Sequence, residues 1–111
     1  MKYVFLLYNI ESEELASPEA MAEWGAYEEY LAHQQAKISG AALQPTATAT
    51  TVSVRDGETL ITDGPFADTK EHLGGFYVLE CADLDQAIEF ARRNPWAPTG
   101  HIEIRPVFGY S

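Results

Sequence analysis

The chain has 111 residues, 46% of them hydrophobic, and a formal net charge of -10 from 17 acidic and 7 basic side chains. This length fits one domain, residues 1–111, around a single hydrophobic core. The acidic excess disfavours binding to nucleic acid or to an anionic membrane surface, because both need clustered lysine and arginine. A single cysteine, Cys81, excludes an internal disulfide, and neither a transmembrane-length apolar run nor a signal-peptide pattern is present, so we expect a cytoplasmic protein.

Three segments have the apolar patterns of strands. Residues 3–8 and 75–81 are apolar on both faces, which is typical of central strands buried on two sides. Residues 101–107 alternate, so that Ile102 and Ile104 point one way and the polar side chains point the other. Something must therefore cover each face of the two central strands.

A first helix is predicted after the acidic loop at residues 9–16. Ser17 has the position of an N-cap and Pro18 that of the first helical residue. Apolar residues at spacings of three, four and seven continue to Ile38, and Gly40 is a suitable C-terminal stop. The Thr-rich segment that follows, residues 41–49, is predicted to be irregular or an edge segment.

A hairpin and a second helix are predicted further along the chain. Residues 50–55 and 58–62 flank the pair Asp56 and Gly57, which is a strong signal for a tight hairpin. Asp83 begins a capping box before the second helix, and the pair at residues 94–95, Asn-Pro, ends it.

The element order is β-α-β-β-α-β with a poorly defined second strand, which predicts an α+β, ferredoxin-like fold: one antiparallel sheet with two helices on one face. The helices leave the other face uncovered although two strands are apolar on both sides. A second copy of the chain is the simplest cover, so we expect a homodimer whose sheets face each other.

The stretch from Asp63 to Phe76 concentrates turn residues, both charge signs and a histidine between two predicted strands. Loops of this kind between rigid strands often carry binding and catalysis. The Gly64-Pro65 pair is expected to end a strand. Phe66, a large apolar residue among polar ones, is expected to anchor the loop in the core. The pair at 74–75, Gly-Gly, allows a sharp turn or a close approach to the backbone.

Four charged residues are candidates for one polar cluster, if this loop folds over the last strand. Lys70 and Arg105 would hold a substrate carboxylate, and Asp63 or Glu71 would move a proton. A salt-bridge network that only pins the loop is the alternative interpretation.

The histidines and aromatic residues leave alternatives open. His72 and His101 are candidate bases, although lone histidines more often serve as hydrogen-bonding groups. His33 lies one turn after Glu29 and can be a surface pair. The histidines and the cysteine do not have the spacing of metal ligands, and the sequence contains no nucleotide-binding motif. We therefore expect neither a metal site nor an organic cofactor. Core or dimer packing is favoured over an aromatic ligand pocket for Trp24, Tyr27, Tyr30 and Trp96.

Three segments resemble the YCII-related, DGPF-type proteins of bacteria: D-G-P-F-A-D-T-K-E-H-L-G-G-F-Y, C-A-D-L-D-Q-A-I-E-F-A and I-E-I-R-P-V. The resemblance runs from the hairpin to Pro106. It implies the fold of dimeric α/β-barrel proteins and a regulatory context near extracytoplasmic-function sigma factors. Some related proteins are regarded as lyases or dehalogenases of small lactones. The matching motif positions are Asp63, Gly64, Pro65, Phe66, Lys70, Glu71, Gly74, Gly75, Glu103 and Arg105.

The family's His-Asp acid/base pair corresponds loosely to His33 and Asp63. With the histidines considered above, the candidate catalytic residues are Asp63, Glu71, His33 and His72. The candidate substrate-binding residues are Gly64, Pro65, Phe66, Lys70, His101, Glu103 and Arg105. The sequence favours a cofactor-independent lyase or isomerase acting on a small carboxylate or lactone at a polar dimer cleft. A non-catalytic ligand-binding or regulatory module, with protein partners in sigma-factor systems, is the alternative.

Overall fold

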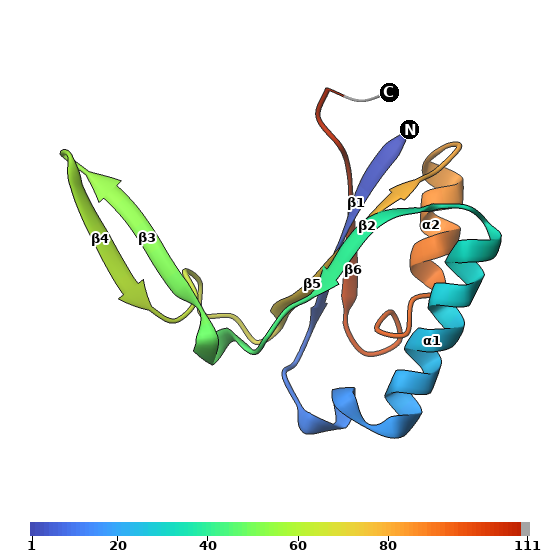
Figure 1. Cartoon of the computed structure of the whole chain (residues 1–111), viewed down its shortest axis with the longest axis horizontal. Helices are drawn as coiled ribbons and strands as arrows, with labels where there is room; N and C mark the ends of the chain where they lie inside the picture. Colours follow the sequence, from blue (N-terminus) through green and yellow to red (C-terminus); the bar gives the residue numbers. More distant parts are fainter. Residues whose placement is uncertain (110–111) are drawn as a thin grey trace.

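The computed structural model describes residues 1–109 and contains a four-stranded antiparallel sheet of order β2-β5-β1-β6 (Figure 1). Both helices cover one face of this sheet, and β3 and β4 form a separate two-stranded ribbon. The predicted α+β ferredoxin-like fold is confirmed. The elements are β1 Lys2–Asn9, α1 Pro18–His33, β2 Lys37–Ala42, β3 Thr50–Arg55, β4 Glu58–Asp63, β5 His72–Glu80, α2 Leu84–Arg92 and β6 His101–Pro106, with short 3-10 turns at Glu13–Ala16 and Thr46–Thr48.

Both helices begin at the predicted caps. The Ser17 hydroxyl accepts a hydrogen bond from the backbone N–H of Ala20, and the Asp83 carboxylate accepts one from Gln86. The Gln86 side chain in turn accepts from the N–H of Ala82 at 2.6 Å. Each cap satisfies backbone donors that have no partner inside the helix, which fixes where the helix starts.

The predicted end of the first helix is wrong. Helix α1 ends at His33, because Gln35 takes the left-handed conformation (φ 52°) and Ala36 N–H bonds back to the carbonyl of Leu31. A second bond, from Gln35 N–H to Ala32, completes a Schellman motif, in which Leu31 and Ala36 are both buried. The following residues, including Gly40, form the edge strand β2 and not a helix terminus.

The hydrophobic core lies between the sheet and the two helices. Alternate residues of β1 point into it: Tyr3, Phe5 and Leu7 are each at most 4% exposed. Helix α1 contributes Tyr27 and Leu31 to the same core. The remaining buried apolar residues are Ala36, Tyr77, Leu79, Cys81, Ala87, Phe90 and Ala91. Burial raises the pKa of the Cys81 thiol to about 11, so Cys81 acts as a small apolar residue.

The other face of the sheet carries no helix (Figure 1). The strand register places Val4 opposite Val78, and Leu6 opposite Phe76, on this open face, and all four are half-buried. The polar side of β6 joins them, since Arg105 pairs with Val4 and Glu103 with Leu6. We call Val4, Leu6, Phe76, Val78, His101, Glu103 and Arg105 the open face.

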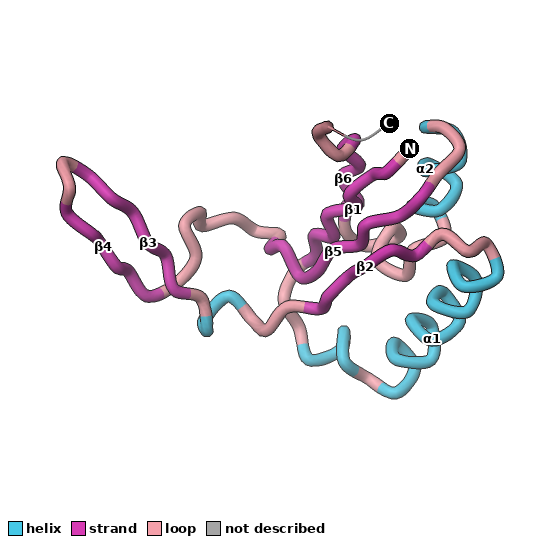
Figure 2. The backbone as a smooth tube through the Cα atoms, turned by 45° about the horizontal axis from the view of Figure 1, so that its top comes forward, coloured by secondary structure: helices cyan, strands magenta, loops and turns pink. Residues whose placement is uncertain are grey.

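The β3–β4 hairpin forms as predicted around Asp56 and Gly57, whose φ angles of 52° and 78° suit a tight two-residue turn. It projects from the side of the sheet opposite the helices, and a second view shows the same arrangement (Figure 2). The hairpin therefore extends beyond the open face instead of adding to the main sheet.

The predicted role of Phe66 as a core anchor is wrong, because its side chain is 91% exposed. β4 ends at Asp63 before Gly64 (φ 100°), as expected. The two glycines at 74–75 lie inside β5, which begins at His72, earlier than predicted. They serve close approach and not a turn, since a Cβ on Gly74 would overlap the indole of Trp96.

Candidate functional site

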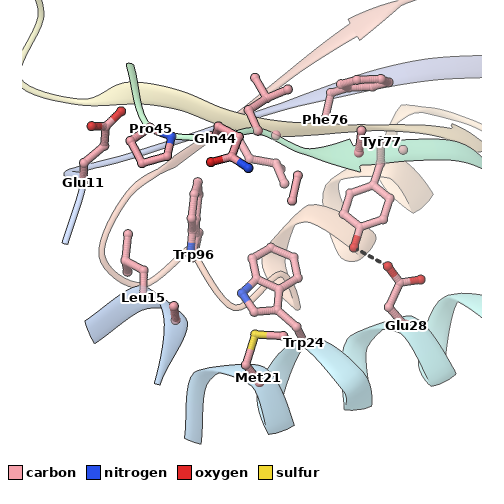
Figure 3. A pocket seen from close by; sticks show the side chains of 18 of the residues that line it. Glu11, Leu15, Met21, Trp24, Glu28, Gln44, Pro45, Phe76, Tyr77 and Trp96 are labelled. Atoms are coloured by element: carbon pink, nitrogen blue, oxygen red, sulfur yellow. Dashed lines mark hydrogen bonds between the residues drawn. The ribbon is translucent and has the colours of Figure 1, made fainter. Parts of the chain in front are cut away.

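A pocket of about 570 Å³ lies on the helix-covered side of the sheet, between its β2–β5 edge and the start of α1 (Figure 3). Its lining is mainly apolar and aromatic, with a small number of charged groups. This composition is typical of small-molecule sites. The lining residues that Figure 3 labels are Glu11, Leu15, Met21, Trp24, Glu28, Gln44, Pro45, Phe76, Tyr77 and Trp96.

Two glycines make room for the aromatic rings that line the pocket. Gly40 on β2 lies opposite Tyr77 on β5, and a Cβ there would stand 2.9 Å from the Tyr77 ring and 2.8 Å from a backbone oxygen. A Cβ on Gly74 would come still closer to the ring of Trp96. A larger side chain at either position would therefore force the neighbouring atoms to move.

The two tryptophans of the chain both line the pocket. Their rings meet edge to face with centroids 5.8 Å apart, and Trp24 also stacks near Tyr77 at 6.4 Å. Trp96 is held by its backbone, which donates to the Asn94 side chain and accepts from Gly100. The packing predicted for these aromatics is confirmed, and the aromatic pocket considered as its alternative is present as well.

Three polar side chains converge beside the aromatic rings. Tyr77 donates its hydroxyl hydrogen to Glu28 Oε1 at 2.7 Å, and Lys37 Nζ lies 3.2 and 3.0 Å from the two carboxylate oxygens (Figure 3 draws the Tyr77 bond). Burial favours a higher pKa for Glu28, but the hydrogen bonds from Tyr77 and Lys37 outweigh it and leave that pKa lowered. Burial, and then the bond to Glu28, raise the pKa of Tyr77. Glu28 is therefore ionised and Tyr77 protonated at neutral pH.

Glu11 connects the pocket to one of the predicted site residues. Its carboxylate accepts from the backbone and hydroxyl of Thr46, at 2.7 and 3.2 Å, and lies 3.9 Å from Nδ1 of His72. That nitrogen is buried and has no hydrogen-bond partner among residues 1–109. His72, the first residue of β5, thus lies beside Glu11 at the pocket rim.

The structure brings two pairs of predicted site residues together, outside the pocket. Glu71 lies 2.9 Å from Nδ1 of His101, joining the start of β5 to the start of β6 across the end of β1. Glu103 and Arg105 lie side by side on β6, with 4.0 Å between carboxylate and guanidinium.

The other predicted site residues are dispersed. Asp63, Phe66 and Lys70 are exposed, and neither Asp63 nor Lys70 forms an ion pair with any residue from 1 to 109. His33 is exposed at the end of α1 and does not line the pocket. The expected cluster of Asp63, Lys70, Glu71 and Arg105 does not form within one chain. The catalytic and binding roles of these residues stay predictions.

Sequence reasoning missed the group formed by Glu28, Tyr77 and Lys37. Nothing in the sequence singled out Glu28 on the predicted first helix, and Lys37 was assigned to that same helix, which was expected to continue to Ile38. Lys37 reaches β2 only because α1 ends at His33, and the sequence has no glycine there to signal that end.

Among residues 1–109 no three His, Cys, Asp or Glu side chains are grouped so as to hold a metal ion.

Comparison with protein families gives a decisive match: the model of the YCII-related domain covers residues 1–111. The protein belongs to the YCII-related family. An uncharacterized protein of Rhizobium meliloti (strain 1021) is 39% identical to this YCII-related chain, over 99% of its length and 94% of the relative's.

Among solved structures, the YCII-related chain resembles 5-chloro-2-hydroxyhydroquinone dehydrochlorinase (TftG) from Burkholderia phenoliruptrix AC1100, in complex with 2,5-dihydroxybenzoquinone. The TM-score is 0.57 at 16% identity, and the match covers 96% of this chain and 93% of the other. At that identity the likeness concerns the fold alone. In the part of the YCII-related chain that the structure describes, neither helix has the length and apolar character needed to span a bilayer.

Proposed function

We propose that this YCII-related protein is a small-molecule enzyme of lyase or isomerase character, with its reaction centre in the pocket between α1 and the β2–β5 edge. One observation carries the proposal: an ionised carboxylate, a protonated phenol and an ammonium group converge at the wall of an aromatic pocket. Such a set can remove a proton and stabilise the anion that results.

In the proposed reaction Glu28 is the general base. A carboxylate offers about four acceptor positions, and the bonds from Tyr77 and Lys37 use three, so one stays free for a substrate proton. Glu28 takes a proton from carbon next to a carbonyl, and the electron pair moves onto the carbonyl oxygen, which Lys37 stabilises. Return of the proton to a different carbon completes an isomerisation, and loss of a leaving group completes an elimination.

The shape and chemistry of the lining support the proposed substrate class. Trp24, Trp96 and Tyr77 present ring faces and edges that suit a flat, oxygenated ring. A small lactone or ring carboxylate has that form and carries the acidic C–H that the reaction needs. The 2,5-dihydroxybenzoquinone named for the structural neighbour is also a flat oxygenated ring, and it is a suitable binding probe.

We also propose that the protein works as a homodimer joined through the open face. Val4, Leu6, Phe76 and Val78 form a continuous apolar centre, and the edge strand β6 adds charges of both signs. A sheet with two apolar faces needs a second covering layer. In that dimer the Glu71–His101 pair would lie at the edge of the interface, where the cleft expected from the sequence would form.

The test combines binding and proton exchange. Calorimetry should show that 2,5-dihydroxybenzoquinone binds the wild-type protein at one site per chain. Turnover is measured by NMR with α-angelica lactone as the substrate in D2O. The wild-type protein should accelerate both deuterium incorporation and isomerisation above the uncatalysed rates. Glu28→Gln should retain binding and lose at least about 100-fold of the exchange rate, the usual contribution of a general base.

The matched control is Glu29→Gln, which removes the neighbouring exposed carboxylate and should leave both signals unchanged. Binding by the wild type without any catalysed exchange would contradict the enzyme and favour the ligand-binding module. Absence of both signals would contradict the pocket as the site of this chemistry.

A further inference from the structure

The β3–β4 hairpin has almost no support from its own chain. Its two strands pair with each other from Thr50–Asp63 to Arg55–Glu58, and neither strand packs extensively against another element within residues 1–109. An isolated two-stranded hairpin is at best marginally stable in water. The hairpin therefore needs another contact to stay ordered.

One face of the hairpin supplies apolar surface for that contact. Val52 lies directly opposite Ile61, with Val54 next along β3, and the three side chains are 60%, 67% and 59% exposed. The strand alternation puts Ser53 and Leu60 on the other face. We call Val52, Val54 and Ile61 the arm face.

The direction of the hairpin identifies what can cover the arm face. It projects on the side of the sheet opposite the helices, beyond the open face (Figure 1, Figure 2). A second chain packed against the open face would occupy the space beside the hairpin. The net charge of -10 disfavours an anionic membrane surface as the alternative cover.

We propose that the β3–β4 hairpin is an arm that packs its apolar face against the second copy of the chain in the homodimer. By two-fold symmetry each copy receives the arm of the other, so the contact occurs twice. The D-G-P-F loop joins the arm to β5, and its exposed Phe66 lies where the two chains meet. This inference rests on the homodimer proposed above and adds a second interface to it.

The test measures the dimer dissociation constant by sedimentation for two double variants of the full chain. Val52→Thr with Ile61→Thr keeps the branched shape that favours strands but makes the arm face polar. We expect the dissociation constant to rise by about tenfold or more. Ser53→Thr with Leu60→Thr changes the cross-strand pair on the opposite face of the hairpin. This control should alter the dissociation constant by less than about twofold.

Hydrogen exchange of the wild-type hairpin amides gives a second readout. Protection of residues 51–63 should rise with protein concentration in step with the dimer fraction, whereas α2 should stay protected throughout. A wild type that is monomeric at all concentrations would overturn both the dimer and the arm. If the dimer is stable, the two variants have equal dissociation constants and the hairpin amides are unprotected, the arm alone would be overturned. Hairpin protection that is complete in the monomer would also overturn it, by showing that the arm packs on its own chain.

Discussion

The two faces of the central sheet have similar sequence patterns and opposite environments. On β1, Tyr3, Phe5 and Leu7 point toward the helices and are almost fully buried. Val4 and Leu6, one residue out of phase, point to the open face and stay half-buried. Equal hydrophobicity therefore does not make the faces equivalent: one is closed by the helices of the chain itself, and the other stays half-buried and is the face proposed above for dimerisation.

The same contrast separates the two groups of candidate site residues. The covered face holds Glu28, Tyr77 and Lys37 in a pocket whose walls are packed within one chain. Most of the motif residues lie on the open face or in the loop between β4 and β5, exposed or paired along the surface, such as Glu71 with His101. Gly74 and Gly75 are the exceptions, since they line the pocket. This contrast agrees with the proposals above, in which the pocket of the covered face binds the ligand and the open face joins two chains.

The largest expected effect comes from substitutions that compare the two faces directly. Phe5→Ala empties a fully buried position and should lower the free energy of unfolding by about 3–5 kcal/mol. Leu6→Ala on the open face should cost about 1–2 kcal/mol in dilute solution, because it removes less buried area. Urea unfolding at several concentrations checks both, and the Leu6→Ala effect should grow as dimer forms. Equal effects at all concentrations would contradict the difference between the faces.

The next largest effect is a loss of stability at alkaline pH, which arises from tyrosines buried on the covered face. Burial raises the pKa of Tyr27 from 10.0 to about 12, and its hydroxyl donates to the carbonyl of Phe90 at 2.9 Å. Below pH 10 the Tyr27 phenol is protonated in both the folded and the unfolded chain, and its contribution to the free energy of unfolding is fully present. Between pH 10 and 12 Tyr27 ionises first in the unfolded chain, so its contribution to the free energy of unfolding should fall by about 3 kcal/mol. Tyr77 and Cys81, whose pKa values are also raised, should add to the loss.

Tyr27→Phe should be about 1 kcal/mol less stable than wild type at pH 7, because it loses a buried hydrogen bond. It should also lose less stability between pH 10 and 12. Unfolding curves of the two proteins across that range provide the measurement. Parallel losses would show that another group causes the alkaline transition.

Gly74→Ala tests how closely the pocket wall is built. The added methyl would overlap the Trp96 indole, so the ring must move, and we expect a loss of about 1–3 kcal/mol in the free energy of unfolding. Thermal unfolding measures the loss, and tryptophan emission should shift as the ring is displaced. Gly25→Ala on α1 is the matched control, since a Cβ there meets no atom within 4 Å. An unchanged Gly74→Ala protein would mean that Trp96 does not define the wall.

The smallest effect on chain stability is expected in the motif loop. Phe66→Ala removes a side chain that is 91% exposed, so dilute protein should change by less than about 0.5 kcal/mol. Urea unfolding at low concentration checks this expectation. A loss above about 2 kcal/mol there would instead support the core anchor predicted from the sequence.

The sequence predicted those features that short-range physics determines. The caps at Ser17 and Asp83 and the turn at Asp56–Gly57 depend on residues within a few positions, and all three are present. The end of α1 was missed because Gln35, not glycine, takes the left-handed position. The Glu28–Tyr77 hydrogen bond joins residues that are 49 positions apart. It depends on how α1 packs against β5, so no local sequence pattern could predict it.

The most direct test of the proposed pocket uses the chain's own fluorescence. Both tryptophans, Trp24 and Trp96, line the pocket, so their emission reports on it without a label. Titration with 2,5-dihydroxybenzoquinone, corrected with free tryptophan for absorbed light, should give saturable quenching that is weakened at least about fivefold by Lys37→Met. Linear quenching, equal in wild type and Lys37→Met, would mean that the ligand meets the rings only by collision and that this pocket is not the site.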